Sequence, residues 1–305
     1  MTEFITPTSE DHWNDLRLQD VTSTEVSALF GCCPYITEYE LWHRKHDKTI
    51  VEFKETERMK WGNRLEASIA KGIAEDFGWA WREMKEYGRL PKERVGASFD
   101  FEILHPKLGQ AALEVKNVDG LEFRNKWVED GDDIEAPPHI ELQLQQQLLV
   151  TGWKIGYIGT LVGGNRVVVI ERRASKKIAQ AILSAVASFW ESIDAGNEPA
   201  IDFDRDSDFI SLLYNHAEPG SVIEPTEEIT TLALEDHELQ QKGKEIESGR
   251  KKVKAQLLAI MGEAEKCKGD DFSISAGVIG AKMIEAHERR AYRSFRINWK
   301  KEKKS

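Results

Sequence analysis

Residues that can carry out hydrolytic chemistry lie in one short stretch, GASFDFEILHPKLGQAALEVKNVD. Asp100 precedes a turn that contains Pro and Gly, and Glu114 and Lys116 follow it. Alternating apolar side chains predict two strands joined as a hairpin, and a turn centred on Lys107 pairs residue 100 with residue 114. Opposite side chains on one face lie about 5 Å apart at Cβ. The two carboxylates would therefore repel each other unless a cation lay between them.

A hard divalent cation fits this arrangement. Mg²⁺ prefers oxygen ligands and typically takes one or two carboxylates together with water and phosphate oxygens. Lys116 shares a face with Glu114 and can reach an attacking water or a phosphate. Asp100, followed by Glu-x-Lys on the next strand, is therefore suited to metal-assisted phosphodiester hydrolysis. A solvated hairpin face with a Glu–Lys pair is the alternative that the same residues allow.

A further acid, Glu66, lies on a predicted helix. Apolar residues recur every four positions over residues 57–77, from Trp61 to Phe77, which indicates an amphipathic helix with one apolar ridge. The residues four positions before Glu66 and four and eight positions after it are small: Gly62, Ala70 and Ala74. Small residues allow close packing, so we expect Glu66 to project into a tight gap. An ordinary surface glutamate is the alternative.

Glutamines gather in a second predicted helix, over residues 140–150, at Gln143, Gln145, Gln146 and Gln147. Uncharged polar groups in such number suit a position near phosphate and water. An exposed glutamine-rich face is the alternative.

Composition limits the function classes. The chain has 305 residues, of which 40% are hydrophobic and 31% charged, as in an ordinary soluble protein. We expect neither a membrane span nor a secretory signal. Three cysteines are too few for a four-cysteine metal site, which favours a reducing cytosol. The net charge of −11 argues against general coating of DNA but leaves an enzyme with a local site open.

Helical and strand patterns alternate over the first two thirds of the chain and predict an α/β (α+β) domain over residues 1–205. A polar, acidic segment predicts a linker over residues 206–231. Residues 232–305 are expected to form a helix plus short strands with a basic tail. The last nineteen residues hold eight Lys and Arg with interleaved aromatics, which suits either nucleic-acid contact or a solubilising tail. The predicted strands cover 95–104, 111–118, 155–161 and 166–172, and the predicted helices cover 57–77, 140–150 and 175–193.

The order of these motifs resembles that of the YqaJ-like viral recombinases, a family that includes bacteriophage lambda exonuclease and belongs to the PD-(D/E)XK nuclease superfamily. The resemblance implies a nuclease core of a mixed central sheet flanked by helices, with a C-terminal appendage. Phe99 stands where the superfamily commonly has Pro, which is a turn residue and not a ligand. The resembling segments are WNDLRLQDVTSTEV (13–26), MKWGNRLEASI (59–69), SFD (98–100), LEVK (113–116) and QLQQQLLVTG (143–152).

The resemblance also implies roles for individual residues. Lys116 would orient or deprotonate the water, and Gln143 or Gln145 would fill the glutamine position of the family. Metal ligands would be Asp100, Glu114, Glu66 and the carbonyl of Val115.

Three further residues, Arg17, Thr24 and Ser98, match positions that hold the 5′-phosphate in lambda exonuclease. The planar guanidinium of Arg17 suits bidentate contact with phosphate. A surface ion pair of Arg17 with Asp15 or Asp20 is the alternative.

The function implied by the resemblance is a 5′-to-3′ exonuclease that acts on double-stranded DNA ends with Mg²⁺, or alternatively Mn²⁺. It would leave 3′ tails for a single-strand-annealing protein. A homo-oligomer is expected, with a ring-shaped trimer as one form, in the cytosol of a bacterial host that carries the phage or prophage. The alternatives are a restriction or repair endonuclease of the same superfamily and a non-catalytic module that binds DNA ends.

Overall fold

The structure is a computed structural model that describes residues 1–48, 55–131 and 133–280. The chain divides into two compact units, residues 1–210 and residues 211–305. The predicted basic tail and part of the predicted strand region before it lie outside the described residues.

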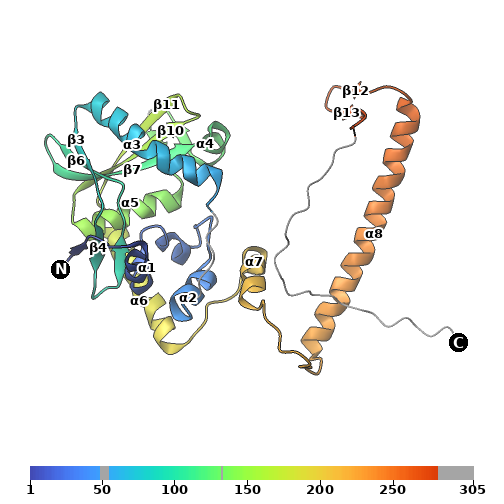
Figure 1. The fold of residues 1–305 in the computed structure, drawn as a ribbon, viewed down its shortest axis with the longest axis horizontal. Coiled ribbons are helices and arrows are strands. Elements are labelled where there is room, and N and C mark those ends of the chain that lie inside the picture. The colour runs from blue at the N-terminus through green and yellow to red at the C-terminus, as the bar shows by residue number, and fades with distance from the viewer. Residues whose placement is uncertain (49–54, 132, 281–305) are drawn as a thin grey trace. The chain divides into compact units, whose positions relative to one another are not determined.

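A five-stranded mixed sheet forms the centre of the N-terminal unit (Figure 1). The order β11-β10-β7-β6-β3 is antiparallel except for β7 and β10, which run parallel. The mixed sheet with flanking helices confirms the predicted fold class. The strands are β3 (Ala80–Glu83), β6 (Phe101–His105), β7 (Gly109–Val118), β10 (Ile155–Val162) and β11 (Arg166–Arg173).

A smaller sheet stands beside it with the order β1-β4-β5-β2. Its strands are β1 (Glu3–Ile5), β2 (Val21–Thr22), β4 (Tyr87–Leu90) and β5 (Val95–Ala97). The prediction of one strand over residues 95–104 was wrong, because the chain leaves the small sheet after Ala97 and enters the large sheet at Phe101. Ser98, Phe99 and Asp100 form the crossing between the two sheets. A separate hairpin is formed by β8 (Val128–Asp130) and β9 (Asp133–Glu135).

Two helices cover opposite faces of the large sheet (Figure 1). On one face α3 (Glu57–Phe77) places Ile69 and Ile73 in a core cluster with Leu113 of β7. On the other face α5 (Pro138–Thr151) places Leu144 and Leu148 in a second cluster with Ala112 and Ile158. Each face of β7 therefore points toward one helix.

The apolar ridge predicted along α3 is buried only in its middle. Trp61 and Phe77 are 50% and 53% exposed, whereas Ile69 and Ile73 are buried. Four residues turn a helix through about 400°, so a row with this spacing drifts off the buried face at both ends. The bounds of α3 agree with the prediction: Thr56 caps its start, and Gly78, with φ of 65°, ends it.

The remaining helices of the N-terminal unit pack around these layers. Residues 203–213, which begin in a polar segment and overlap the predicted linker, form a helix whose Phe209 is buried. The helices are α1 (Glu10–Gln19), the 3₁₀ helix η1 (Val26–Phe30), α2 (Glu38–His46), α4 (Gly120–Lys126), α6 (Lys176–Ala195) and α7 (Phe203–Leu213).

The C-terminal unit consists mainly of one long helix, α8 (Glu227–Met261), in which no residue is buried. A short hairpin of β12 (Lys266–Lys268) and β13 (Ser273–Ser275) follows. No helix within the described ranges is long and apolar enough to cross a membrane.

Candidate active site

The two carboxylates of the predicted hairpin lie opposite each other. β6 pairs with β7 in the register that joins Phe101 to Leu113, and one further step in this register brings Asp100 opposite Glu114. The predicted pairing, with its turn centred on Lys107, is thus correct. Asp100 accepts a hydrogen bond from the backbone N–H of Val115 at 2.8 Å, which fixes the carboxylate at the edge of β7.

Glu114 is a buried acid that is held on both oxygens. Its Oε1 accepts hydrogen bonds from Lys116 Nζ at 2.5 Å and from Gln143 Nε2 at 2.7 Å, and its Oε2 accepts from Gln147 Nε2 at 2.7 Å. Gln143 Oε1 also accepts from Lys116 Nζ at 3.4 Å. Glu114 faces α5 because residues of one parity on β7 point to that helix. Buried charges persist only when paired in this way.

Glu66 reaches the same group of charges from α3. The loss of surrounding water, followed by the charge of Glu114, raises the pKa of both Glu66 and Asp100. Burial disfavours the ammonium of Lys116, but the attraction of Glu114 and Asp100 outweighs this effect and raises the pKa of Lys116. The structure therefore brings Asp100, Glu114, Lys116 and Glu66 into one electrostatic cluster.

This cluster has the ligand chemistry of a hard divalent cation, although it is not a complete protein cage. Among the described residues, no three side chains of His, Cys, Asp or Glu come close enough together to hold an ion alone. Mg²⁺ commonly takes only one or two carboxylates and fills its shell with water and phosphate oxygens. Loss of surrounding water, followed by the negative charge of Glu114, raises the pKa of Glu66 and of Asp100, and a bound cation would favour their charged forms. The carboxylates of Asp100, Glu114 and Glu66 are therefore chemically suited to such an ion when water and substrate oxygens complete its shell, and the participation of the Val115 carbonyl stays a prediction.

The glutamines of α5 are buried, so the alternative of an exposed polar face was wrong. Gln143 contacts Glu114 and Lys116, whereas Gln145 donates to the carbonyl of Arg173 and accepts from the N–H of Ser175. The structure thus brings Gln143 to the cluster and does not bring Gln145. Gln146 donates to two backbone carbonyls of the small sheet, those of Val21 and Gly96.

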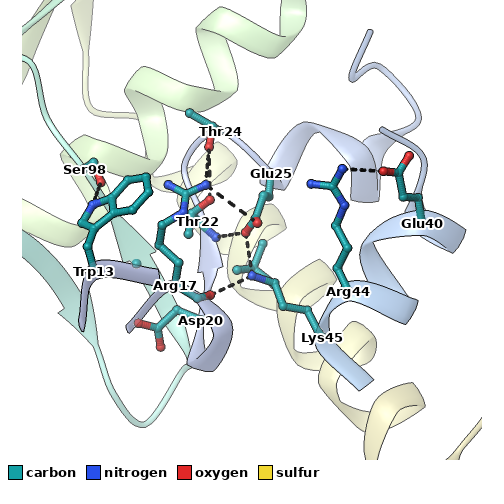
Figure 2. Close-up of polar contacts among 12 residues, drawn as sticks. Trp13, Arg17, Asp20, Thr22, Thr24, Glu25, Glu40, Arg44, Lys45 and Ser98 are labelled. Carbon is teal, nitrogen blue, oxygen red and sulfur yellow. Dashed lines mark hydrogen bonds and ion pairs between the residues drawn. The ribbon is translucent and has the colours of Figure 1, made fainter. Parts of the chain in front are cut away.

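Arg17 and Ser98 contact the ring of Trp13, and Thr24 contacts the guanidinium of Arg17 (Figure 2). The guanidinium of Arg17 lies over Trp13, 4.3 Å from the ring centroid, and donates to Thr24 Oγ1 at 3.4 Å. The indole N–H of Trp13 donates to Ser98 Oγ at 3.3 Å. All three predicted residues are therefore neighbours in space, although they come from α1, the turn before η1 and the crossing segment.

The guanidinium of Arg17 lies near an acid, Glu25, that was not among the predicted site residues. Arg17 is 3.9 Å from Glu25, which also accepts from Lys45 Nζ at 2.9 Å (Figure 2). Lys45 Nζ in turn donates to the backbone carbonyl of Arg17 at 2.7 Å. Asp20 pairs with Arg89, so the described contacts do not support the ion pair of Arg17 with Asp20.

Two more residues near the carboxylates were missed, Thr160 and His139, and Gln147 was predicted only as one of the group of glutamines. Gln147 donates to both Glu114 and the Ser98 carbonyl, while its own Oε1 is buried without a hydrogen-bond partner in the described structure. Thr160 pairs with Lys116 across β7 and β10. His139 packs edge-on against Tyr35, and burial, followed by the charge of Lys116, lowers its pKa to about 4. The place of Gln147 in the cluster could have been predicted, since it lies one helical turn from Gln143; no local signal marks Thr160 or His139.

Comparisons with known proteins agree with the order of motifs in the sequence. The family model of the YqaJ-like viral recombinase domain matches residues 12–154. The chain is 25% identical over 272 residues to the "Uncharacterized protein YqaJ" of Bacillus subtilis (strain 168), covering 85% of this chain and 83% of that protein. Because this share exceeds the N-terminal unit, the similarity extends into residues 211–305.

Solved structures show more distant likeness. An alkaline exonuclease from Laribacter hongkongensis has a TM-score of 0.47 at 16% identity, covering 66% of this chain and 99% of that one. A phage related exonuclease from Haemophilus somnus 129PT has a TM-score of 0.40 at 13% identity, covering 63% and 91%. The likeness to the YqaJ-like family rests on the sequence matches and not on these structural likenesses.

Proposed function

We propose that this chain is a metal-dependent exonuclease, because residues 12–154 match the YqaJ-like viral recombinase domain that the motifs predicted. It acts on double-stranded DNA ends and removes one strand in the 5′-to-3′ direction. The observation that carries this proposal is that Asp100 is held against β7 beside the buried Glu114, with Lys116 and two glutamines bonded to Glu114.

Each residue of this electrostatic cluster has a separate role in the proposed reaction. Asp100, Glu114, Glu66 and the Val115 carbonyl would hold the divalent ion, Mg²⁺ or Mn²⁺. When bound, that ion supplies Lewis-acid activation of the phosphodiester. Lys116 is held as a cation, so it can bind a phosphate oxygen or orient a water next to the carboxylates. Gln143 contacts both Lys116 and Glu114 and keeps them in one fixed arrangement.

The group around Trp13 supplies the preference for a 5′ end. Arg17 offers a charge-assisted donor, the hydroxyl of Thr24 contacts its guanidinium, and the hydroxyl of Ser98 contacts Trp13, over whose ring Arg17 lies. Ser98 is two residues from Asp100 on the crossing segment, which joins this group covalently to the carboxylates. A 5′-terminal phosphate bound here would place the adjoining nucleotides toward the cluster.

The wider setting follows from the family. The 3′ tails left by this reaction would be taken up by a single-strand-annealing protein in phage-type recombination within a bacterial cytosol. A homo-oligomer, including a ring-shaped trimer that encircles DNA, would keep the enzyme on its substrate.

One digestion experiment tests the proposal. End-labelled linear duplex and closed circular DNA are incubated with the full chain and Mg²⁺, with and without chelator. We expect mononucleotides from the linear duplex only, no product with chelator, and no product from Glu114→Gln. Glu102→Gln is the matched control, because Glu102 is an acid of the neighbouring strand that is bound to Arg82 and Gln110 away from the cluster.

Each other outcome points to a different function. Cleavage of the closed circle would indicate an endonuclease of the restriction or repair type. End binding without digestion under Mg²⁺ and Mn²⁺ would indicate a non-catalytic end-binding module. Equal loss of activity in Glu102→Gln and Glu114→Gln would remove the special role given to Glu114.

A further inference from the structure

The C-terminal unit contains the long helix α8 (Figure 1), and its sequence places apolar residues in a stripe along the whole length of the helix. Five apolar residues recur at strict intervals of seven and are 53–83% exposed. They are Leu232, Leu239, Ile246, Val253 and Ile260. A repeat of seven over this length is the pattern of a helix that packs against another helix in a coiled coil.

A coiled coil buries two positions of every heptad along its seam, the line where the two helices meet. The stripe fills one of these positions in α8, and the other position contains charged residues. Counting back three residues from each member of the stripe gives Ile229, Asp236, Gly243, Arg250 and Leu257. This order is nearly symmetric about Gly243, with an apolar residue at each end, and an acid and a base at equal distances from the centre. This symmetry affects the packing only if α8 packs against α8 of a second copy of the chain.

The charges of Asp236 and Arg250 favour an antiparallel pair of helices over a parallel one. In a parallel, in-register pair, Asp236 would face Asp236 and Arg250 would face Arg250 of the second copy, and like charges within a seam repel. In an antiparallel pair with its axis between residues 244 and 245, Asp236 lies one layer, about 4.5 Å along the helix, from Arg250 of the second copy. The long Arg side chain spans that offset, so both pairs attract.

The apolar layers agree with the same axis. Ile229 meets Ile260 of the second copy, Leu232 meets Leu257, and the small Gly243 lies against the large Ile246. Lys242 and Glu247 would attract each other in the parallel arrangement, but at the exposed flanks of the seam, where an ion pair contributes little. The charges inside the seam therefore determine that the pair is antiparallel.

We propose that α8 pairs with α8 of a second copy of this chain as an antiparallel two-stranded coiled coil centred between residues 244 and 245. The helix is 35 residues long, about 50 Å, and long enough for more than four heptads of contact. This pairing does not depend on the nuclease chemistry proposed for the N-terminal unit.

Charge exchange in the full-length chain tests the pairing. Sedimentation velocity over a concentration series gives the association constant for Asp236→Arg, for Arg250→Asp and for the double exchange. We expect each single change to weaken association about tenfold or more, because it places like charges together, and the double exchange to restore it. Glu238→Arg and Lys252→Asp are matched controls, with the same charge changes on exposed positions outside the seam.

Orientation is tested by disulfide trapping. A mixture of Leu232→Cys chains and Leu257→Cys chains should give a crosslink between positions 232 and 257 upon oxidation. Identification of the crosslinked peptides by mass spectrometry separates this product from any formed by the native cysteines Cys32, Cys33 and Cys267.

Three results would overturn the proposal. A 232–232 crosslink would show a parallel pair. Association that is unchanged by both single exchanges would show that copies meet elsewhere. A monomeric wild-type chain would show that the stripe is covered by another occupant, either a segment of this chain or a different protein.

Discussion

Gln147 donates a hydrogen bond to Glu114 Oε2 at 2.7 Å, and the same amide nitrogen donates to the backbone carbonyl of Ser98 at 3.0 Å. One side chain of α5 therefore ties the buried acid of the large sheet to the segment that crosses from the small sheet. The orientation of the Glu114 carboxylate and the position of the crossing segment are set together.

Gln147→Ala should slow hydrolysis roughly 10- to 100-fold, because a hydrogen bond to a buried charge contributes about 1.5–3 kcal/mol. Single-turnover digestion of linear duplex measures this change. Gln145→Ala is the matched control: its amide bonds Arg173 and Ser175, so the thermal midpoint should fall while the rate per folded molecule stays near wild type. Equal rates in both variants would contradict the role given to Gln147.

Lys116→Ala should reduce the hydrolysis rate by about 10² to 10³, since a fixed positive charge acts mainly on the transition state. Calorimetric titration with Mn²⁺ should show metal affinity close to that of the wild type. Lys116→Arg should recover part of the rate. If the Ala variant no longer binds metal, Lys116 instead supports the structure of the site.

Arg17→Ala should slow digestion of 5′-phosphorylated duplex by about tenfold or more relative to duplex with a 5′-hydroxyl, because the charge-assisted contact with the terminal phosphate is lost. Initial rates on the two substrates, compared within one preparation, measure the effect. Arg89→Ala removes a cation bound to Asp20 and should affect both substrates alike. Equal slowing by Arg17→Ala would mean that Arg17 holds the fold.

Acid should destabilise the N-terminal unit through Glu25. Burial favours the neutral form of this carboxyl, but the attraction of Lys45 and Arg17 outweighs burial and lowers its pKa from 4.5 to about 2. The resulting stabilisation is fully present above pH 4.5 and is lost as the pH falls through 2. It amounts to about 3 kcal/mol.

Urea unfolding at several pH values between 2 and 6 measures this contribution. Glu25→Gln should show a shallower loss of unfolding free energy with falling pH than the wild type. Glu191→Gln, at an exposed position of α6, should follow the wild-type curve. Parallel curves for wild type and Glu25→Gln would show that the Glu25–Lys45 pair does not stabilise the fold.

Local patterns were enough to place the hairpin of the candidate site. The turn residues and the alternation of side chains fix the register that brings Asp100 opposite Glu114, and both are properties of neighbouring residues. The ends of α3 could also be predicted from the local sequence, because Thr56 and Gly78 cap the helix.

Nonlocal partners could not be predicted. Apolar alternation continues without a break through Val95, Ala97 and Phe99, so the pattern gave no sign that the chain changes sheets. The buried glutamines looked suited to solvent or phosphate because their partners are far away in the sequence, such as the Glu114 carboxylate for Gln143 and the Gly96 carbonyl for Gln146. Satisfying buried polar groups is a property of the whole fold.

The crossing between the two sheets also limits how the chain tolerates insertions and deletions. Ser98 and Asp100 are separated by a single buried residue, Phe99, and each end of this span enters a different sheet. One added residue would have to be accommodated by shifting Asp100 out of line with Val115 or by moving Ser98 away from Trp13. Most loops absorb a change in length at little cost; this one should not, and a one-residue insertion here should be more damaging than one between Gly163 and Asn165.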